Sequence, residues 1–245
     1  MYSFLKEEGI DGFEIAPTRI FPENPYGDLE RVAAFKTLMK EAYNLKVISL
    51  QSICFGRSEA IFSTEQERNA LLDYIKLSID FASVLECRNL VFGSPKNRII
   101  GEGMETVAVD YFSQIGQYAE EKNTVFAFEP NPVIYGTNFI NTTSEALAFV
   151  KKCDVKGLKV NFDLGTVIYN NESLSVLEDN LDWINHIHIS EPYLEVIQHR
   201  SLHNELADIL RKKNYSKYVS VEMKGGTALE KIKDTIHYIK DAFKN

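Results

Sequence analysis

The sequence predicts an α/β fold, namely a (β/α)8 TIM barrel that lacks its first strand. Seven short, β-rich apolar runs alternate with longer stretches whose apolar residues have helical spacing. The ends of successive runs lie 25 to 41 residues apart, and no linker or change in composition interrupts the series. Neither GxGxxG nor GxxxxGK[ST] occurs, and a doubly wound open sheet usually carries such a phosphate-binding turn after its first strand. A barrel is therefore favoured over an open sheet.

The predicted strands cover residues 12–16, 46–53, 89–94, 125–130, 158–165, 184–190 and 218–224. Strands that alternate with helices pair in parallel, because each crossover helix returns the chain to the same end of the sheet. A closed barrel of this type needs one more strand than these seven runs provide. We therefore expect an unpaired edge between strands 12–16 and 218–224, covered by a partner chain or by residues upstream of Met1.

The predicted helices begin at recognisable capping residues. Residues 28–44 place several apolar side chains, Leu38 among them, on one helical face, with Asp28 as the N-cap. Thr64-x-x-Glu67 and Thr142-x-x-Glu145 have the spacing of capping boxes, which open helices that run toward Leu85 and Val150. We expect further helices over residues 105–121, 172–181, 201–212 and 227–243.

The size and composition of the chain limit its class. A single domain over residues 1–245, 44% of them hydrophobic, buries roughly 70–75% of its unfolded surface and needs no covalent staples. The three cysteines form no CxxC pair, which excludes a disulfide framework or a structural zinc site. A net charge of −8 without a basic run argues against nucleic acid as a partner. No stretch of 18 apolar residues and no signal peptide is present, so we expect a cytoplasmic protein without a membrane anchor.

Four consecutive predicted strands end in residues that can bind metal ions. These residues are Glu129, Asp163, His188 and Glu222, and functional side chains of such barrels lie at the carboxyl ends of the strands. One alternative is that each pairs separately with a buried lysine or arginine. Four groups at matching depth favour a shared divalent cation, and three carboxylates with one imidazole suit Mn²⁺, Co²⁺, Mg²⁺ or Zn²⁺. His186 has the same strand parity and is interpreted as a core histidine one layer below.

Other polar residues follow the predicted strands and form a candidate substrate-binding set. Most of the basic residues at this end of the barrel, which include Arg19 and Arg57, are interpreted as solvated loop charges. The exceptions are Lys96 and Arg98, a closely spaced pair that suits a phosphate or a carboxylate, and Lys224. Asn131 and Tyr135 follow Glu129 in the sequence and are expected to bond sugar hydroxyls, although Asn131 could equally cap its own turn.

These motifs resemble the xylose isomerase-like TIM barrels, specifically the sugar phosphate isomerase/epimerase group that includes ketose 3-epimerases and inosose dehydratases. The resemblance extends from GIDGFEIAPTR through FEPNP, NFDLG and HIHISEP to SVEMK. It implies that Glu129, Asp163, His188 and Glu222 ligate one metal ion, and that Glu129 and Glu222 form the acid/base pair. Two departures stand out. Thr166 replaces the histidine of the D-x-G-H motif, and Ser190-Glu191-Pro192-Tyr193 occupies the segment where the epimerases often carry an arginine.

The leading functional hypothesis is a metal-dependent isomerase or epimerase. It would act on a sugar, sugar phosphate or sugar acid through a metal-stabilised enediolate, with a small-molecule carbohydrate as its partner. A dehydratase of the same family would share the first proton abstraction. A non-catalytic sugar- or metal-binding barrel is the alternative from another class, suggested by the missing strand and the two departures. The sequence leaves a homo-oligomer open.

Overall fold

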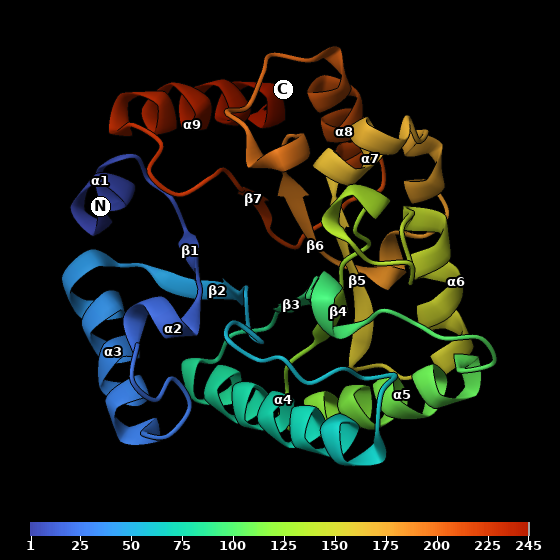
Figure 1. Cartoon of the computed structure of the whole chain (residues 1–245). Coiled ribbons are helices and arrows are strands. Elements are labelled where there is room, and N and C mark those ends of the chain that lie inside the picture. Colours follow the sequence, from blue (N-terminus) through green and yellow to red (C-terminus); the bar gives the residue numbers. More distant parts are fainter. Residues whose placement is uncertain (245) are drawn as a thin grey trace.

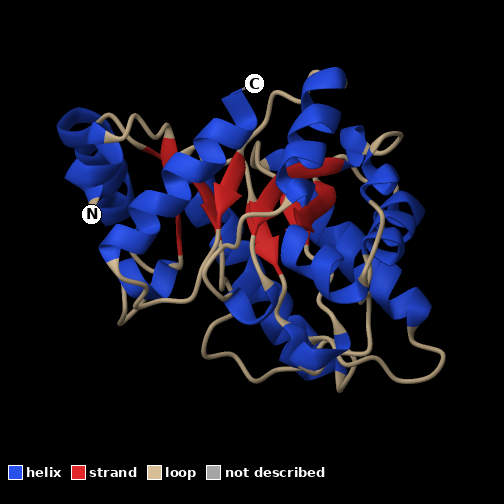
Figure 2. Cartoon of the chain, turned by 90° about the horizontal axis from the view of Figure 1, so that it is seen from above, coloured by secondary structure: helices blue, strands red, loops and turns tan. Residues whose placement is uncertain are grey.

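The computed structural model describes residues 1–244 and contains one sheet of seven parallel strands in sequential order. The sheet curls into a nearly closed barrel inside a ring of helices (Figure 1), and Figure 2 shows the strands enclosed by helices from a second direction. The strands are β1 (Gly12–Ile15), β2 (Lys46–Leu50), β3 (Leu90–Phe92), β4 (Phe126–Phe128), β5 (Leu158–Asp163), β6 (Ile184–Ile189) and β7 (Val219–Val221). All seven predicted strands and the TIM-barrel fold are confirmed.

The sheet has its two edges at β1 and β7. Within residues 1–244 these two strands do not pair with each other, so the predicted open edge is confirmed. The surrounding helices do meet across this side, because Nε2 of His237 in α9 (Leu229–Lys244) lies 2.6 Å from the carboxylate of Glu8, which follows α1 (Tyr2–Glu7). Cover of the edge by a partner chain stays a prediction.

The remaining helices mostly agree with the expected ranges. They are α2 (Pro17–Ile20), α3 (Leu29–Tyr43), α4 (Glu65–Leu85), α5 (Glu105–Glu121), α6 (Thr143–Cys153), α7 (Leu164–Asn170) and α8 (Ser201–Lys212), with 3₁₀ turns at Pro95–Asn97, Val133–Tyr135, Leu174–Leu177, Leu181–Trp183 and Pro192–Leu194. Asp28 caps α3 by accepting from Arg31 N at 2.9 Å, and Thr142 forms the complete predicted capping box. None of the helices among residues 1–244 is long and apolar enough to cross a membrane.

Three local predictions are wrong. The box at Thr64 is half formed, because the Glu67 carboxylate accepts from Ala60 N at 3.0 Å rather than from its N-cap. The expected apolar face of α3 includes Leu38, which is 54% exposed. The predicted helix at 172–181 is wrong, because that range holds the 3₁₀ turn Leu174–Leu177 and the start of the turn Leu181–Trp183. The helix forms earlier, as α7, because Asp163 accepts from Thr166 N at 2.8 Å and caps it directly after β5.

The apolar core lies between the sheet and the helices. Phe92 of β3 packs against Phe112 of α5 with ring centroids 5.4 Å apart, and Phe128 of β4 meets Phe149 of α6 at 5.6 Å. On the strands' other face, buried polar side chains form a connected layer, in which Asn89 Nδ2 donates to Ser49 Oγ at 2.9 Å and lies 3.4 Å from Asn161 Oδ1. This polar layer lies directly below the candidate site.

Candidate metal centre

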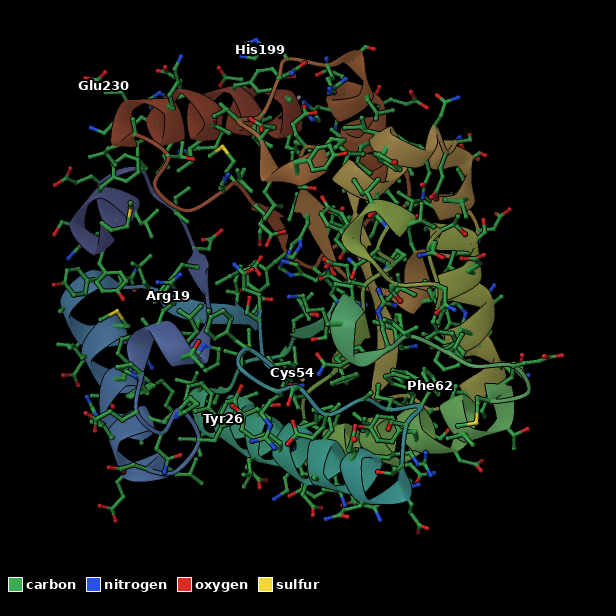
Figure 3. All side chains as sticks on the ribbon, viewed as in Figure 1. Arg19, Tyr26, Cys54, Phe62, His199 and Glu230 are labelled. Atoms are coloured by element: carbon green, nitrogen blue, oxygen red, sulfur yellow. The ribbon has the colours of Figure 1, made fainter. Side chains whose placement is uncertain are left out.

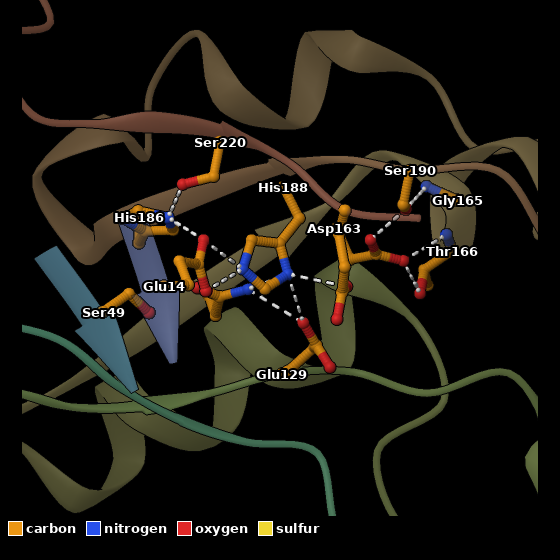
Figure 4. Close-up of polar contacts among 12 residues, drawn as sticks. Glu14, Ser49, Glu129, Asp163, Gly165, Thr166, His186, His188, Ser190 and Ser220 are labelled. Carbon is orange, nitrogen blue, oxygen red and sulfur yellow. Dashed lines mark hydrogen bonds and ion pairs between the residues drawn. The ribbon is translucent and has the colours of Figure 1, made fainter. Parts of the chain in front are cut away.

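The four predicted metal ligands come together at the carboxyl ends of β4 to β7. Glu129 follows β4, Asp163 ends β5, His188 lies in β6 and Glu222 follows β7. One ligand atom from each residue lies within 4.8 Å of those of the other three. Figure 4 shows the imidazole of His188 between Glu129 and Asp163. The arrangement matches the set of side chains expected from the sequence.

The sheet itself fixes the two glutamates. Glu129 N donates to Phe92 O at 3.0 Å, and Glu222 N donates to Ile189 O at 2.9 Å, so each residue continues the ladder of its strand by one hydrogen bond. Gly93 provides the space for the Glu129 carboxylate, since a Cβ at position 93 would lie 2.9 Å from Glu129 Oε2. Both glutamates are therefore held by backbone geometry at the floor of the barrel mouth.

His188 is fully buried and presents its two ring nitrogens to different groups. Its Nδ1 lies 3.0 Å from Glu129 Oε1 and 3.2 Å from Glu222 Oε2, on the side of the candidate ligands. Its Nε2 lies 3.1 Å from both carboxylate oxygens of Glu14 in β1. Burial lowers the pKa of His188, but the surrounding carboxylates outweigh burial and hold this pKa well above its usual value.

Glu14 contacts the buried histidines of the candidate site and was missed by the sequence analysis. Its carboxylate lies 2.9 Å from His186 Nε2, and that nitrogen also lies 2.7 Å from Ser220 Oγ (Figure 4). Burial disfavours the carboxylate form of Glu14, but the charges and hydrogen bonds of His188 and His186 hold its pKa well below the usual range. The available signal was a glutamate inside the otherwise apolar run GFEIA. Glu14 orients His188 in the way that second carboxylates orient metal-bound histidines.

Asp163 is oriented by the start of α7 and by Ser190, the residue after β6. Ser190 donates its hydroxyl to Oδ1, while Thr166 N donates to Oδ2 at 2.8 Å. The Thr166 hydroxyl lies 2.9 Å from the same oxygen and is buried. Burial and the charge of Glu129 raise the pKa of Asp163 despite these bonds. Thr166, at the position of the family's D-x-G-H histidine, therefore contacts the aspartate and does not reach the cavity.

The charge balance of the cluster fits a divalent cation. Among residues 1–244, the ion pairs of Glu129 and Glu222 are with His188 alone, and Asp163 forms none. The alternative in which each carboxylate pairs with its own lysine or arginine is therefore wrong. Three partly buried carboxylates with one buried imidazole need further positive charge, and the four donors suit a hard or borderline dication.

A second group, formed by Glu14, His186 and His188, is also compact enough to hold a metal ion. Its atoms already bond one another and Ser220 at 2.7 to 3.1 Å. None of the three residues lines a described cavity. We interpret this group as the support of the metal centre, which agrees with the sequence-based view of His186 as a core histidine.

A cavity of about 220 Å³ opens above the cluster. Two of the predicted substrate contacts, Asn131 and Tyr135, line this cavity together with Glu129, Asp163 and Glu222. The remaining lining residues are Gln51, Ser52, Val91, Gly93, Ser94, Pro95, Glu191 and Leu194. The geometry therefore brings the predicted catalytic, ligand and hydroxyl-binding residues into one space.

The three predicted basic contacts lie elsewhere. Lys96 and Lys224 are exposed and do not line the cavity. Arg98 is fully buried beneath the cavity wall, where it donates to Glu129 O at 2.9 Å and to Asn131 Oδ1 at 2.8 Å. Its expected role as an anion ligand is replaced by a positioning role, because its guanidinium has no surface left for a substrate.

Glu191 lines the cavity and was not predicted as a site residue. It is 2% exposed and accepts two hydrogen bonds from Arg200, from Nε at 2.7 Å and from Nη2 at 2.6 Å. This bidentate pair holds the segment after β6. It is the same segment in which the epimerases often carry an arginine and this sequence has none. Arg200 comes from further along the chain, so the motif alone gave no signal of the pair.

Comparison with known families agrees with this architecture. The model of the xylose isomerase-like TIM barrel matches residues 2–242. The chain belongs to this family. No curated protein matches the sequence.

Several solved structures share the fold. An E. coli 3-keto-D-glucoside 4-epimerase in its apo form is 21% identical, with a TM-score of 0.79 over 98% of this chain and 92% of that one. A D-psicose 3-epimerase solved in the presence of D-fructose is 15% identical, with a TM-score of 0.81 over 100% and 93%. The IolI protein with a bound zinc atom is 15% identical, with a TM-score of 0.69 over 97% and 88%. At these identities the likeness establishes the fold.

Proposed function

We propose that this protein is a divalent-metal-dependent isomerase or epimerase that acts on a sugar, sugar phosphate or sugar acid. The observation that carries the proposal is the convergence of Glu129, Asp163, His188 and Glu222 on one point, without a lysine or arginine partner among residues 1–244. A bound Mn²⁺, Co²⁺, Mg²⁺ or Zn²⁺ ion would supply Lewis-acid stabilisation of the charge that develops on substrate oxygens.

Glu129 and Glu222 are the proposed acid/base pair. They come from β4 and β7, which are not neighbours in the sheet, so they approach the cavity from different strands. Glu129 Oε1 accepts from Asn161 Nδ2 at 2.8 Å, while Oε2 lies 3.4 Å from Asn131 Nδ2 beside the cavity. Oε2 is thus the atom best placed to take a carbon-bound proton, and Glu222 returns a proton from the other side.

Two further side chains of the cavity suit sugar hydroxyls. The Tyr135 oxygen accepts from Tyr193 N at 2.9 Å, so the Tyr135 hydroxyl proton is available for a substrate oxygen. Asn131 is held by Arg98, which fixes the direction of its side-chain amide. These contacts orient a polyol without adding charge.

The comparisons support this chemistry, since two of the similar folds are a keto-glucoside 4-epimerase and a psicose 3-epimerase, and a third was solved with zinc. An epimerase or isomerase must break and remake a carbon–hydrogen bond. A dehydratase would break the same bond and then expel hydroxide, so loss of water from the substrate would distinguish it.

The test is solvent exchange. Metal-loaded protein is incubated with ketoses, their phosphates and sugar acids in D₂O, and carbon-bound deuterium is measured by NMR and mass spectrometry. We expect incorporation that disappears on chelation, returns with Mn²⁺ and is abolished in Glu222→Gln. Lys96→Ala, outside the cavity, should retain exchange. Folded, metal-loaded protein that exchanges no substrate of the panel would overturn the proposal.

A further inference from the structure

A second cavity, of about 510 Å³, is lined mainly by the segments that follow β1 and β2. We propose that this groove binds an anionic group, a phosphate or a carboxylate, at the end of the substrate remote from the reacting carbons. This inference rests on the proposed function and narrows its substrate class. The groove is lined by Thr18, Arg19, Pro22 and Pro25 after β1, by Phe55, Gly56 and Arg57 after β2, and by Tyr74 of α4.

The groove adjoins the metal-site cavity across one turn of the chain. Ser52 lines the metal-site cavity, and Phe55 lines the groove. Phe55 N donates to Ser52 O at 2.9 Å, and the Cα atoms that flank such a β-turn lie within about 7 Å of each other. Because the strands are parallel, the segments after β1 and β2 lie on the same rim as the metal ligands. One substrate can therefore extend from one cavity into the other.

The two cavities carry opposite charges. The groove is lined by two guanidinium groups, those of Arg19 and Arg57, and by no acidic residue. The metal-site cavity is lined by four acidic residues and by no lysine or arginine. Arg57 forms an ion pair with Glu59, which does not line the groove, so the unpaired charge of the groove is that of Arg19. The pair of cavities is complementary to a molecule whose oxygens bind a cation at one end and whose other end is an anion.

Arg57 is held in place before any ligand binds. Its guanidinium carbon lies 4.6 Å from the ring centroid of Tyr74, and Nη2 bonds the side chain of Glu59. The backbone is fixed as well, because Arg57 N donates to Cys54 O at 3.0 Å and its carbonyl accepts from Asn97 Nδ2 at 3.3 Å. The guanidinium therefore loses little conformational freedom on binding an anion.

Both arginines retain free donors. Arg57 Nε is buried and out of reach of a ligand, but Arg57 Nη1 is solvent-accessible and forms no hydrogen bond with any of residues 1–244. Arg19, which is exposed on α2, forms no ion pair with any of those residues. In Figure 3, Arg19, Cys54 and Tyr26 lie on the side of the barrel built by β1, β2 and α4. Two guanidinium groups with unused donors at one groove suit an anion.

Phe55 adds an apolar wall. Its side chain is 63% exposed although it is aromatic, and two prolines line the same groove. An exposed aromatic ring at a cavity suits the carbon face of a sugar or of an attached ring. The groove thus takes a substrate portion that is partly apolar and ends in an anion.

The first experiment measures binding of inorganic phosphate by calorimetry or ³¹P NMR, with and without chelator. We expect binding to wild type, and a weakening of about 10–100-fold in both Arg19→Ala and Arg57→Gln, as for the loss of a charged hydrogen bond. Arg211→Ala, which removes the same charge from the outer helix α8, is the matched control and should bind normally. Arg19→Ala keeps the test valid if Arg57→Gln fails to fold, because Arg19 is exposed.

Phosphate binding should persist in Glu222→Gln and after chelation, because the groove contains no metal ligand. This separates the two proposals, since failure of metal-dependent exchange leaves phosphate binding unchanged. Phosphate that does not bind wild type, or that binds the Arg19→Ala, Arg57→Gln double variant as well as wild type, would overturn the groove assignment.

The second experiment identifies the source of the anion. D-fructose, D-fructose 6-phosphate and D-glucuronate are compared as ligands of metal-loaded protein. A phosphate source predicts that fructose 6-phosphate binds at least tenfold more tightly than fructose, and a carboxylate source predicts the same advantage for glucuronate. In either case, Arg19→Ala should remove the advantage of the charged ligand. Equal affinity for neutral and charged sugars would refute the inference and leave the metal-dependent chemistry intact.

Discussion

Glu14 gives the sharpest test of the metal centre, because it touches a ligand without being one. Its two carboxylate oxygens lie 3.1 Å from Nε2 of His188, while Nδ1 of the same ring faces the other ligands. A carboxylate at Nε2 favours the tautomer with the proton on Nε2, which leaves the lone pair of Nδ1 free for a metal ion. Glu14→Ala should therefore weaken metal binding although the four ligands remain.

The magnitude follows from the hydrogen bond that is lost. A bond to a charged group is worth about 1.5–3 kcal/mol, which corresponds to about 10–100-fold in metal affinity. Glu14→Gln keeps an acceptor but loses the charge. Charged hydrogen bonds are about twice as strong as neutral ones, so Glu14→Gln should lose about half of the free energy that Glu14→Ala loses. Half of that free energy corresponds to a decrease of about 3–10-fold in metal affinity.

The assay is Zn²⁺ affinity by competition with a chelator, combined with ¹⁵N NMR of labelled histidine to assign the tautomer of His188. Ser220→Ala is the matched control, since Ser220 Oγ bonds His186 in the same buried layer, and it should leave affinity unchanged. In a His188→Ala background, Glu14→Ala should have no further effect. A Glu14→Ala protein that is folded and binds Zn²⁺ within twofold of wild type would refute the reasoning, as would an equal loss in both backgrounds.

Three further predictions concern the same site. A divalent ion at a hundredfold excess over its Kd should add about 2.7 kcal/mol of stability, or about 5–11 °C in Tm for a chain of this size, and Glu222→Gln should reduce this gain in a thermal melt. The pKa values of His188 and Asp163 are raised in the metal-free protein, so metal binding must release protons. Zn²⁺ affinity should therefore rise with pH and keep rising above the ordinary histidine pKa of about 6.5. Calorimetry in buffers of different ionisation enthalpy checks this through the number of protons released. Gly93→Ala should displace Glu129, since the new Cβ would lie 2.9 Å from its Oε2, and should lower deuterium exchange more than Zn²⁺ binding; equal effects on both would contradict the role of Oε2 as the base.

The fold and the clustering of Glu129, Asp163, His188 and Glu222 were predictable because both depend on local patterns. An apolar run that ends in a carboxylate is visible in FAFE or in NFD, and parallel strands bring such ends to one rim. The start of α7 was not predictable in the same way. Asp163 serves both as a strand end and as an N-cap, and the strand pattern concealed the second role.

Long-range polar contacts were the main omission. Arg98 follows a strand as a substrate contact would, yet its guanidinium turns inward to Glu129 O and Phe139 O and lies over the Phe128 ring at 4.6 Å. Glu14 bonds His188, which lies 174 positions further along the chain and on a strand that does not pair with β1. Spacing along one chain does not reveal which buried polar groups meet across a barrel.

The two departures from the family pattern and the basic groove are consistent with one change in recognition. On the β5 and β6 side, Thr166 bonds Asp163 and Glu191 bonds Arg200, so neither position presents a basic side chain to the cavity. On the β1 and β2 side, Arg19 and Arg57 line the adjoining groove. A substrate held by a remote anion needs fewer contacts around its reacting carbons, because binding energy from a distant group can orient the reacting end. A substrate that lacks the remote anionic group should therefore show a lower kcat as well as a higher KM. The substitution Thr166→His should not restore either value for that substrate.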